Sequence, residues 1–280
     1  NYISGVSAQL KSAVILAGLN SYGKTKIIEK SVSRDHTENM LAKNKNVIQI
    51  NKKNRTIDLI GKKFLEPIDV TVPGDPSSAA FFTALTLLKS NSSITIKNIG
   101  LNPSRIGFYK ILKSQGAEIN FKNLRKLNHE TIGDIVVKSC KLKPINAARK
   151  YYVSMTDEYP ILFVIASLIK GVSVFHGIKE LANKESNRIS EMQKVLKQIG
   201  VRSVFSNDKL KIFGKDITEF KNKKITVNKL GDHRICMSSF ILSLLIGADT
   251  KIKGFDTVFT SSPSFLKIIK KLGAKFEIQK

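Results

Sequence analysis

The sequence predicts an α/β protein built from repeated units in which strands and helices alternate. One pattern occurs four times: a polar or charged cluster, an apolar run of helix length, a turn containing glycine and a short segment rich in β-forming residues. The spacing of roughly 75 residues is far longer than a solenoid repeat, so each copy is expected to be a folding unit. The copies begin at Ser7, Ser77, Asp157 and Asp232.

Three of the copies also end in nearly the same way. Residues 111–117, 195–201 and 268–274 align in register, and each stretch is typical of an amphipathic helix that stops at a glycine in the C′ position. Alternating residues that favour a strand follow, as in residues 274–278. Each unit is therefore expected to run strand, helix, strand, helix, strand, strand.

The first copy occupies the chain up to about residue 66. Residues 1–3 already favour a strand that leads into the first polar cluster, and the Asn, Ser and Gly residues of 20–23 favour a turn. The expected order is a helix over 8–19, a strand over 26–29, a helix after His36 and two short strands within 44–63.

A boundary is expected near Glu66 and Pro67. Three further copies run over residues 68–143, 144–214 and 215–280, so three packed units are expected to form one domain over 67–280. Residues 1–66 hold a single copy, and the chain opens inside a strand without an initiator Met. These features predict a fragment of a longer protein.

Composition restricts the function classes. An apolar fraction of 42% can supply ordinary cores, and the longest apolar run is too short to cross a bilayer. The formal net charge of +25 would suit nucleic-acid binding, but the lysines are spread over nearly every segment and no RNP-type or zinc-finger motif occurs. Cys140 and Cys236 offer neither a metal spacing nor a disulfide framework, which favours a reducing cytoplasm.

Arginine is more informative than lysine, because the chain has eight arginines against thirty-nine lysines. Where lysine is the usual cation, an arginine indicates a need for its planar fork, which suits carboxylate and phosphate groups. Half of the arginines lie in the polar clusters that open the halves of the units: Arg34, Arg105, Arg188 and Arg234.

Each cluster precedes an apolar helix, whose N-terminal end favours anions. Taken singly, Ser7, Ser77 and Asp157 could simply be N-cap residues. If Lys184 begins a helix, Arg188 lies one turn away on the same face. Together the clusters supply carboxylates, a lysine and arginines, which is what a phosphorylated and carboxylated substrate needs. No glycine pattern for ATP or NAD occurs.

At these clusters the sequence resembles the 5-enolpyruvylshikimate-3-phosphate synthase family, in its bacterial class II form. The resemblance implies two lobes of three βαβαββ units each, in an inside-out barrel; four of the six are present, with 1–66 as the last N-terminal unit and 67–280 as the C-terminal lobe. The matching motifs are Ser7-Ala8-Gln9-Leu10-Lys11-Ser12-Ala13, Ser33-Arg34-Asp35-His36-Thr37-Glu38, Pro73-Gly74-Asp75-Pro76-Ser77-Ser78-Ala79-Ala80, Asn102-Pro103-Ser104-Arg105, Asp157-Glu158-Tyr159-Pro160, Lys184-Glu185-Ser186-Asn187-Arg188 and Asp232-His233-Arg234.

The resemblance also implies a reaction: the enolpyruvyl group of phosphoenolpyruvate moves to the 5-hydroxyl of shikimate 3-phosphate and phosphate leaves. No metal or cofactor is expected, the full-length protein would be a cytoplasmic monomer, and neither nucleic acid nor membrane is an expected partner. Asp157, Lys184 and Glu185 are the implied catalytic residues. The implied substrate-binding residues are Ser7, Ala8, Gln9, Arg34, Asp157, Lys184, Arg188 and Arg234.

The sequence departs from the family pattern at three positions. Asn187 stands where the family usually has Asp, and Ala182 stands where it has a basic residue. Thr260 aligns with a ligand-binding Lys of many members, so it is assigned no contact. Two alternatives stay open: an enolpyruvyl transferase for a nucleotide sugar, whose loop nucleophile is not visible here, and a basic nucleic-acid-binding repeat protein. The fragment alone is expected to be incomplete for activity.

Overall fold

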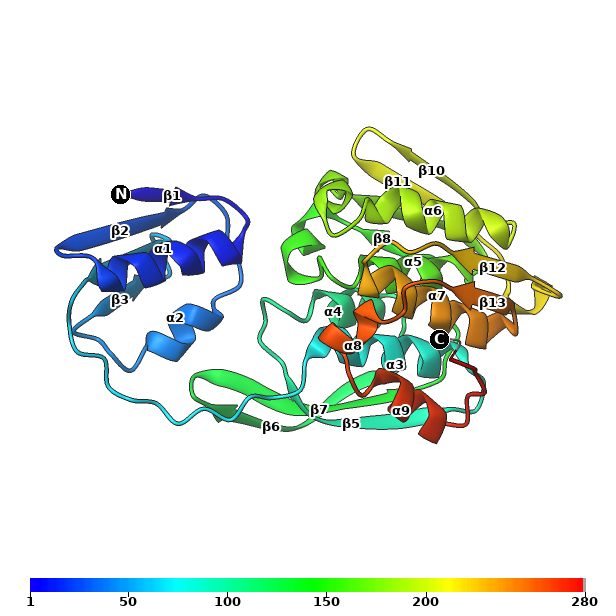
Figure 1. Cartoon of the computed structure of the whole chain (residues 1–280), viewed down its shortest axis with the longest axis horizontal. Coiled ribbons are helices and arrows are strands. Elements are labelled where there is room, and N and C mark those ends of the chain that lie inside the picture. The colour runs from blue at the N-terminus through cyan, green and yellow to red at the C-terminus, as the bar shows by residue number, and fades with distance from the viewer. Residues whose placement is uncertain (279–280) are drawn as a thin grey trace.

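The computed structural model describes residues 1–278, which form two parts joined by one extended segment (Figure 1). We call residues 1–66 the N-terminal unit and residues 67–278 the C-terminal part. The N-terminal unit lies at the left of Figure 1, and the extended segment passes below it to reach the larger part.

The N-terminal unit has the predicted order of strands and helices. Its four strands form one sheet in the order β1-β2-β4-β3, in which only β1 and β2 are parallel. The strands at 26–29 and within 44–63 and both helices are therefore confirmed, with small differences at their ends. The elements are β1 (Tyr2–Ser4), α1 (Ala8–Asn20), β2 (Lys24–Glu29), α2 (His36–Leu41), β3 (Ile48–Asn51) and β4 (Thr56–Ile60).

The second unit lacks a regular first strand. Residues 68–72 form no strand, and the only pairing before the first helix is an isolated parallel bridge between Gly74 and Ile99. This stretch is largely exposed, so burial does not favour an extended pairing there. The remaining elements are α3 (Pro76–Leu88), β5 (Ser93–Gly100), α4 (Gly107–Ser114), β6 (Ile119–Leu127) and β7 (Glu130–Lys138).

The third unit is complete. Its four strands form a sheet in the order β10-β11-β9-β8, and two short 3-10 helices precede its α-helices. The elements are β8 (Asn146–Ala147), η1 (Arg149–Ser154), α5 (Tyr159–Ser167), β9 (Gly171–His176), η2 (Lys179–Asn183), α6 (Arg188–Gln198), β10 (Arg202–Ser206) and β11 (Lys209–Gly214).

The fourth unit ends differently from the prediction. Residues 274–278 do not form a strand; instead the Phe276 ring packs against Phe240 with the ring centroids 5.5 Å apart. Burial of this aromatic side chain on α7 thus holds the segment without strand pairing. The elements are η3 (Ile217–Glu219), β12 (Lys224–Val227), α7 (His233–Ile246), β13 (Asp249–Ile252), α8 (Thr257–Ser261) and α9 (Phe265–Lys271).

The three similar helix ends are confirmed. The glycines that follow α4, α6 and α9 all have positive φ, at +93° for Gly116, +79° for Gly200 and +93° for Gly273. After α4, the amide of Ala117 donates to the carbonyl of Leu112 over 3.0 Å, which closes the helix end. Glycine adopts this left-handed conformation without the steric cost that a Cβ imposes, so it ends each helix at the same point.

The core of the C-terminal part consists of α3, α5 and α7, which pack against one another while the sheets lie around them (Figure 1). Every residue of α5 is buried, which accounts for its continuous apolar sequence. The helices thus lie inside and the sheets outside. This arrangement leaves the beginnings of the three helices at the side that faces the N-terminal unit.

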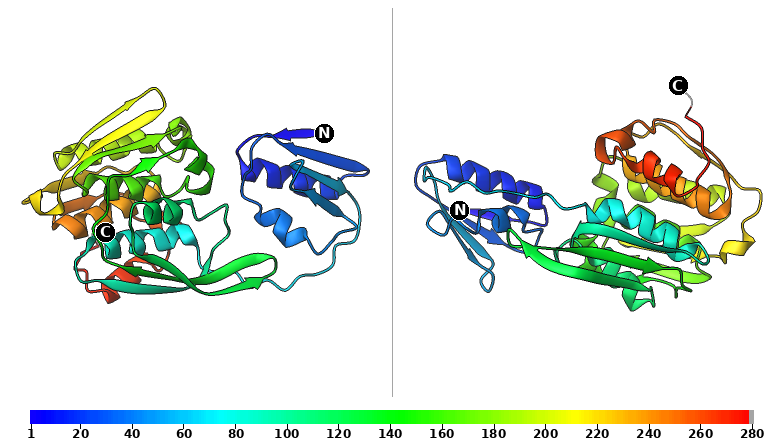
Figure 2. Two further views of the ribbon diagram at one scale, coloured as in Figure 1. Left: turned by 180° about the vertical axis from the view of Figure 1, so that it is seen from behind. Right: turned by 90° about the horizontal axis from the view of Figure 1, so that it is seen from below.

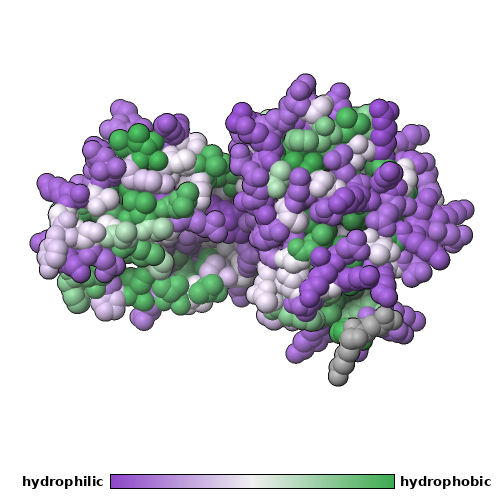
Figure 3. Space-filling model, turned by 45° about the horizontal axis from the view of Figure 1, so that its top comes forward, coloured by the Kyte–Doolittle hydropathy of each residue, from purple (hydrophilic) through white to green (hydrophobic). Residues whose placement is uncertain are grey.

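The N-terminal unit has a separate small core. We propose that the domain boundary lies near residue 66, because the two hydrophobic clusters lie on either side of the largely exposed stretch 62–72. Leu10 and Leu16 of α1 remain more than half exposed, and Figure 3 shows hydrophobic groups on this unit. The core residues of this unit are Ile15, Ile27, Ile48, Ile57 and Leu59.

No helix within residues 1–278 is long and apolar enough to cross a membrane.

Candidate active site between the two parts

The beginnings of α3, α5 and α7 form one side of the candidate site. Asp75 caps α3 by accepting a hydrogen bond from the amide of Ser78 over 2.9 Å, and Asp232 caps α7 by accepting from the amide of Arg234 over 2.9 Å. The expectation that Ser77 caps α3 is therefore wrong by two residues. Three helix N-termini on the same side favour the binding of anions there.

Asp157 connects the two parts. Its Oδ2 accepts a hydrogen bond of 2.7 Å from Arg34 of the N-terminal unit, and its Oδ1 lies 3.7 Å from Nη1 of Arg188. Burial raises the pKa of Asp157, but the surrounding guanidinium groups, with Arg34 the strongest and Arg234 also close, outweigh burial and hold that pKa well below its ordinary value. Asp157 is therefore ionised at neutral pH.

The capping interpretation of Asp157 is wrong. Glu158 occupies the N-cap position of α5, and Asp157 makes no capping bond there. The aspartate is thus free to face the arginines. The alternative that treated each cluster as a simple helix cap holds for Ser7, whose hydroxyl accepts from the amide of Leu10 over 3.3 Å.

Arg188 is held in place by carboxylates on both sides. Its side chain is 1% exposed; Nε donates to Asp232 over 3.0 Å, and Nη2 donates to Glu185 over 2.5 Å. Asp232 is fully buried and also accepts a hydrogen bond of 2.9 Å from Ser186. Although burial raises the pKa of Asp232, its attraction to Arg188 and these hydrogen bonds lower the pKa overall.

Asp232 and Ser186 hold Arg188 in place, and the sequence prediction did not name them among the site residues. Both belong to the quoted clusters, and the available signal was the carboxylate at 232, two positions before Arg234. What spacing could not show is that Asp232, 44 positions from Arg188 in the chain, is the residue that orients it.

Three buried guanidinium nitrogens have no hydrogen-bond partner within residues 1–278: Nε of Arg105, and, beside Asp157, Nη1 of Arg188 and Nη1 of Arg234. The Arg234 guanidinium lies 5.9 Å from the centroid of the Phe81 ring, and its residue is 8% exposed. Buried N–H groups are nearly always hydrogen-bonded in folded proteins, because an unpaired one loses its bonds to water. Two such groups beside Asp157 are suited to the oxygens of a carboxylate or phosphate.

Glu158 is a second carboxyl group close to these arginines, and it is buried. It is 2% exposed, and burial, together with the nearby charge of Asp157, raises its pKa. Arg105, by contrast, is used within the fold: its Nη2 donates to Asp75 over 2.9 Å and to Ser77 over 2.7 Å. Of the four arginines in the clusters, three therefore gather around Asp157 and one holds the start of α3.

The predicted residues at the start of α1 make no side-chain hydrogen bond or ion pair with Arg34 or Asp157 among residues 1–278. Ser7 caps the helix, Ala8 begins it, and Gln9 is exposed in its first turn. The structure links α1 to the Arg34 segment through Lys11, whose fully buried ammonium contacts Glu38 and lies 2.8 Å from Glu29. Lys11 was part of the quoted motif but was assigned no role.

Lys184 is not where the helical spacing predicted. It is exposed in an extended conformation after η2, and α6 begins only at Arg188. The physical reason is the cap: Asn187 Oδ1 accepts from the amide of Ser190 over 3.1 Å, which sets the first residue of the helix. Asn187 thus fills the N-cap position that an aspartate could also fill, and no ion pair of Lys184 is present in residues 1–278.

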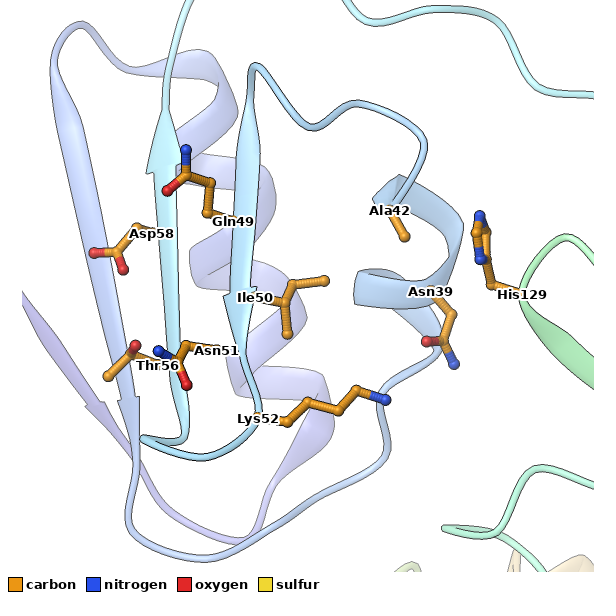
Figure 4. Close-up of a pocket in the computed structure, with 9 residues that line it drawn as sticks. All are labelled: Asn39, Ala42, Gln49, Ile50, Asn51, Lys52, Thr56, Asp58 and His129. Atoms are coloured by element: carbon orange, nitrogen blue, oxygen red, sulfur yellow. The ribbon is translucent and has the colours of Figure 1, made fainter.

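A hollow lies between the N-terminal unit and the tip of the β6–β7 hairpin (Figure 4). Figure 4 shows residues of β3 and β4 on one side and Asn39, Ala42 and His129 on the other. Its lining residues include neither an arginine nor Asp157, so it is separate from the cluster around Asp157. Within the same described residues, no group of three or more His, Cys, Asp or Glu side chains could hold a metal ion.

Solved structures place this fold among the enolpyruvyl transferases. The enolpyruvyl transferase NikO from Streptomyces tendae is similar in fold, with a TM-score of 0.71 at 14% identity over 98% of this chain and 64% of that one. An EPSP synthase from Acinetobacter baumannii is more similar, with a TM-score of 0.87 at 33% identity over 99% of this chain and 64% of that one.

The model of the EPSP synthase (3-phosphoshikimate 1-carboxyvinyltransferase) family matches residues 2–269, and the chain belongs to this family. The 3-phosphoshikimate 1-carboxyvinyltransferase of Zymomonas mobilis is 39% identical over 276 residues, which is 97% of this chain and 61% of that protein. That of Persephonella marina is 39% identical over 268 residues, which is 95% of this chain and 61% of that protein. The chain thus spans about three fifths of the length of these curated relatives.

Proposed function

We propose that this site takes part in the transfer of the enolpyruvyl group from phosphoenolpyruvate to the 5-hydroxyl of shikimate 3-phosphate. The observation that carries the proposal is the ionised Asp157 among Arg34, Arg188 and Arg234, two of which keep unpartnered buried N–H groups. Both substrates are phosphorylated carboxylates, so they offer the oxygens that such forks bind. Family membership supports the same assignment.

In the proposed reaction, the 5-hydroxyl oxygen attacks C2 of phosphoenolpyruvate and its proton passes to Asp157. Glu185 gives a proton to the methylene carbon C3, and a tetrahedral intermediate forms. The bond between C2 and the phosphate oxygen then breaks, phosphate leaves with the proton that Asp157 took up, and C3 returns a proton to Glu185. Arg188 and Arg234 hold the phosphoenolpyruvate anion, and Lys184 binds near the hydroxyl.

The Arg34–Asp157 pair gives this site a way to respond to substrate. While Arg34 donates to Asp157 over 2.7 Å, the low pKa of Asp157 makes it a weak base. A phosphate or hydroxyl oxygen of shikimate 3-phosphate that accepts the Arg34 bond would remove part of this stabilisation and raise the basicity of the carboxylate. The substrate would thus activate its own proton acceptor.

Isothermal titration of the 280-residue chain with shikimate 3-phosphate, with and without phosphoenolpyruvate, tests the proposal. A hydrogen bond to a charged group contributes roughly 1.5–3 kcal/mol, so Arg34→Ala should weaken binding by about 10- to 100-fold. Arg202→Ala is the control, because Arg202 stacks on Phe213 in the β10–β11 hairpin, away from the site. No binding to the parent chain, or equal losses in both variants, would contradict the proposal.

Phosphate release from the two substrates measures the complete reaction. A nucleotide-sugar acceptor should neither replace shikimate 3-phosphate nor compete with it; competition would favour the alternative enolpyruvyl transferase. We also propose a cytoplasmic protein that is monomeric at full length and binds no nucleic acid. Sedimentation and titration with a generic DNA duplex at low salt test the last two statements.

A further inference from the structure

The β6–β7 hairpin reaches from the C-terminal part to the N-terminal unit. Figure 1 and the view from below in Figure 2 both show the hairpin running along the lower side and ending close to that unit. Its turn is formed by Asn128 and His129, which have positive φ, and β7 begins at Glu130. A carboxylate is therefore placed at the tip of a long hairpin, against the start of α2.

Glu130 binds three side chains with its two oxygens. Oε1 accepts from Nδ1 of His36 over 2.7 Å and from Nδ2 of Asn39 over 3.1 Å, and Oε2 accepts from Nδ2 of Asn102 over 2.9 Å. An ionised carboxylate only accepts, so Nδ1 of His36 carries the hydrogen. Burial raises the pKa of Glu130, but these three hydrogen bonds outweigh it and lower the pKa overall.

Asn102 connects the hairpin to the segment that carries Arg34. Asn102 is 4% exposed, and its amide donates to Glu130 and also to Asp35 over 2.8 Å. Its carbonyl oxygen accepts from the amide of Ser104 over 2.8 Å and from the Ser104 hydroxyl over 2.7 Å. All four hydrogen-bonding positions of the side chain are thus occupied, so it cannot rotate without breaking several bonds.

These contacts fix the chain on both sides of Arg34. On one side, the buried Ser33 donates to Glu29 over 3.1 Å, and Glu29 is in turn bound by Lys11. On the other side, Asp35 is bound by Asn102 of the C-terminal part. The Arg34 side chain then extends to Asp157. The first anchor belongs to the N-terminal unit, whereas the second crosses between the two parts.

We propose that Glu130 and Asn102 are positioning residues that hold Arg34 against Asp157. They contact neither Asp157 nor the unpartnered arginine nitrogens, and they act through Asp35, His36 and Asn39, the residues that flank Arg34. Their consequence for binding shikimate 3-phosphate rests on the proposed function, but their effect on the position of Arg34 does not.

The guanidinium NMR signal of Arg34 tests the positioning without any ligand. With eight arginines in the chain, the signal can be assigned from its loss in Arg34→Lys. In Glu130→Gln, the amide that replaces one oxygen cannot accept, so one or two donors lose their partner. We expect exchange of the Arg34 guanidinium protons with water to accelerate about tenfold, the equivalent of one charge-assisted hydrogen bond.

Glu118→Gln is the matched control, because Glu118 is exposed near the base of the same hairpin and its side chain makes no hydrogen bond or ion pair among residues 1–278. It makes the same change of charge and should leave the Arg34 signal unchanged. Asn102→Ala should also accelerate exchange of the Arg34 guanidinium protons. If the Asn102→Ala variant does not fold, the result for Glu130→Gln alone tests the proposal. An Arg34 signal that is unchanged in Glu130→Gln, or changed equally by the control, overturns the proposal.

A double-mutant cycle on shikimate 3-phosphate binding separates positioning from general stability. If Glu130 acts through Arg34, Glu130→Gln should weaken binding about tenfold in the parent but have little further effect in Arg34→Ala. Equal effects in both backgrounds overturn the positioning role. If the parent chain binds no shikimate 3-phosphate, the proposed function fails, while the ligand-free NMR result still decides whether Glu130 positions Arg34.

Discussion

Replacement of Lys11 by methionine should destabilise the N-terminal unit strongly. The Lys11 side chain is fully buried between two carboxylates, with Glu29 at 2.8 Å and Glu38 in closer contact. Removing one partner of a buried ion pair costs about 3–5 kcal/mol, because a charge remains in the interior. Glu29 is 13% exposed and keeps its bond from Ser33, so we expect the lower end of this range, about 3 kcal/mol at neutral pH.

The loss of stability in Lys11→Met should become smaller as the pH falls. Burial raises the pKa of Glu38, and Lys11 is the group that opposes this rise. Without Lys11 the pKa of Glu38 rises further, so the carboxyl takes up a proton more readily as the pH falls. A protonated Glu38 no longer leaves a buried charge, so the difference in stability between Lys11→Met and the parent should shrink towards acidic pH.

Hydrogen exchange of the backbone amides in β2 and β4 measures this effect, because these strands belong to the separate core of the N-terminal unit. A loss of about 3 kcal/mol should accelerate their exchange by about 100-fold at neutral pH. Lys53→Met is the control, since Lys53 is exposed on the same unit. Exchange within a few fold of the parent, or an acceleration that does not shrink at acidic pH, would refute the reasoning.

Three further predictions concern the C-terminal part. Because the pKa of Glu158 is raised, the folded state binds a proton that the unfolded state releases, so the free energy of unfolding falls as the pH rises. Glu158→Gln should weaken this pH dependence, as measured by urea unfolding. The same pH dependence in the variant and the parent would contradict the prediction. Asn187→Ala should cost about 1 kcal/mol in thermal unfolding through loss of the α6 cap, whereas Ser206→Ala should cost little. Gly200→Ala should lower the free energy of unfolding by about 1–2 kcal/mol, because φ is +79° and a Cβ disfavours this conformation. The space for a Cβ is open, so no clash adds to this cost. An unchanged melting temperature would show that the backbone relaxes.

Much of the fold was readable from local patterns. The C′ glycines at 116, 200 and 273 and the polar residue at the start of each apolar run specify helix ends through contacts within a few residues, so the sequence alone predicts them. The strand expected over 274–278 was wrong, because alternation favours an extended chain but cannot say whether a neighbouring strand is available. The condition that Lys184 begins a helix is not met, because the cap at Asn187 makes Arg188 the first helical residue.

The chemistry of the site divides in the same way. The sequence by itself determined which side chains were available, because arginine in a lysine-rich chain indicates binding of carboxylate or phosphate groups, and the carboxylates before apolar helices can move protons. Only the tertiary structure decided that Arg34 pairs with Asp157, 123 positions away, and that Glu130 contacts His36, 94 positions away. Such contacts depend on how the two parts pack, and no spacing along the chain encodes them.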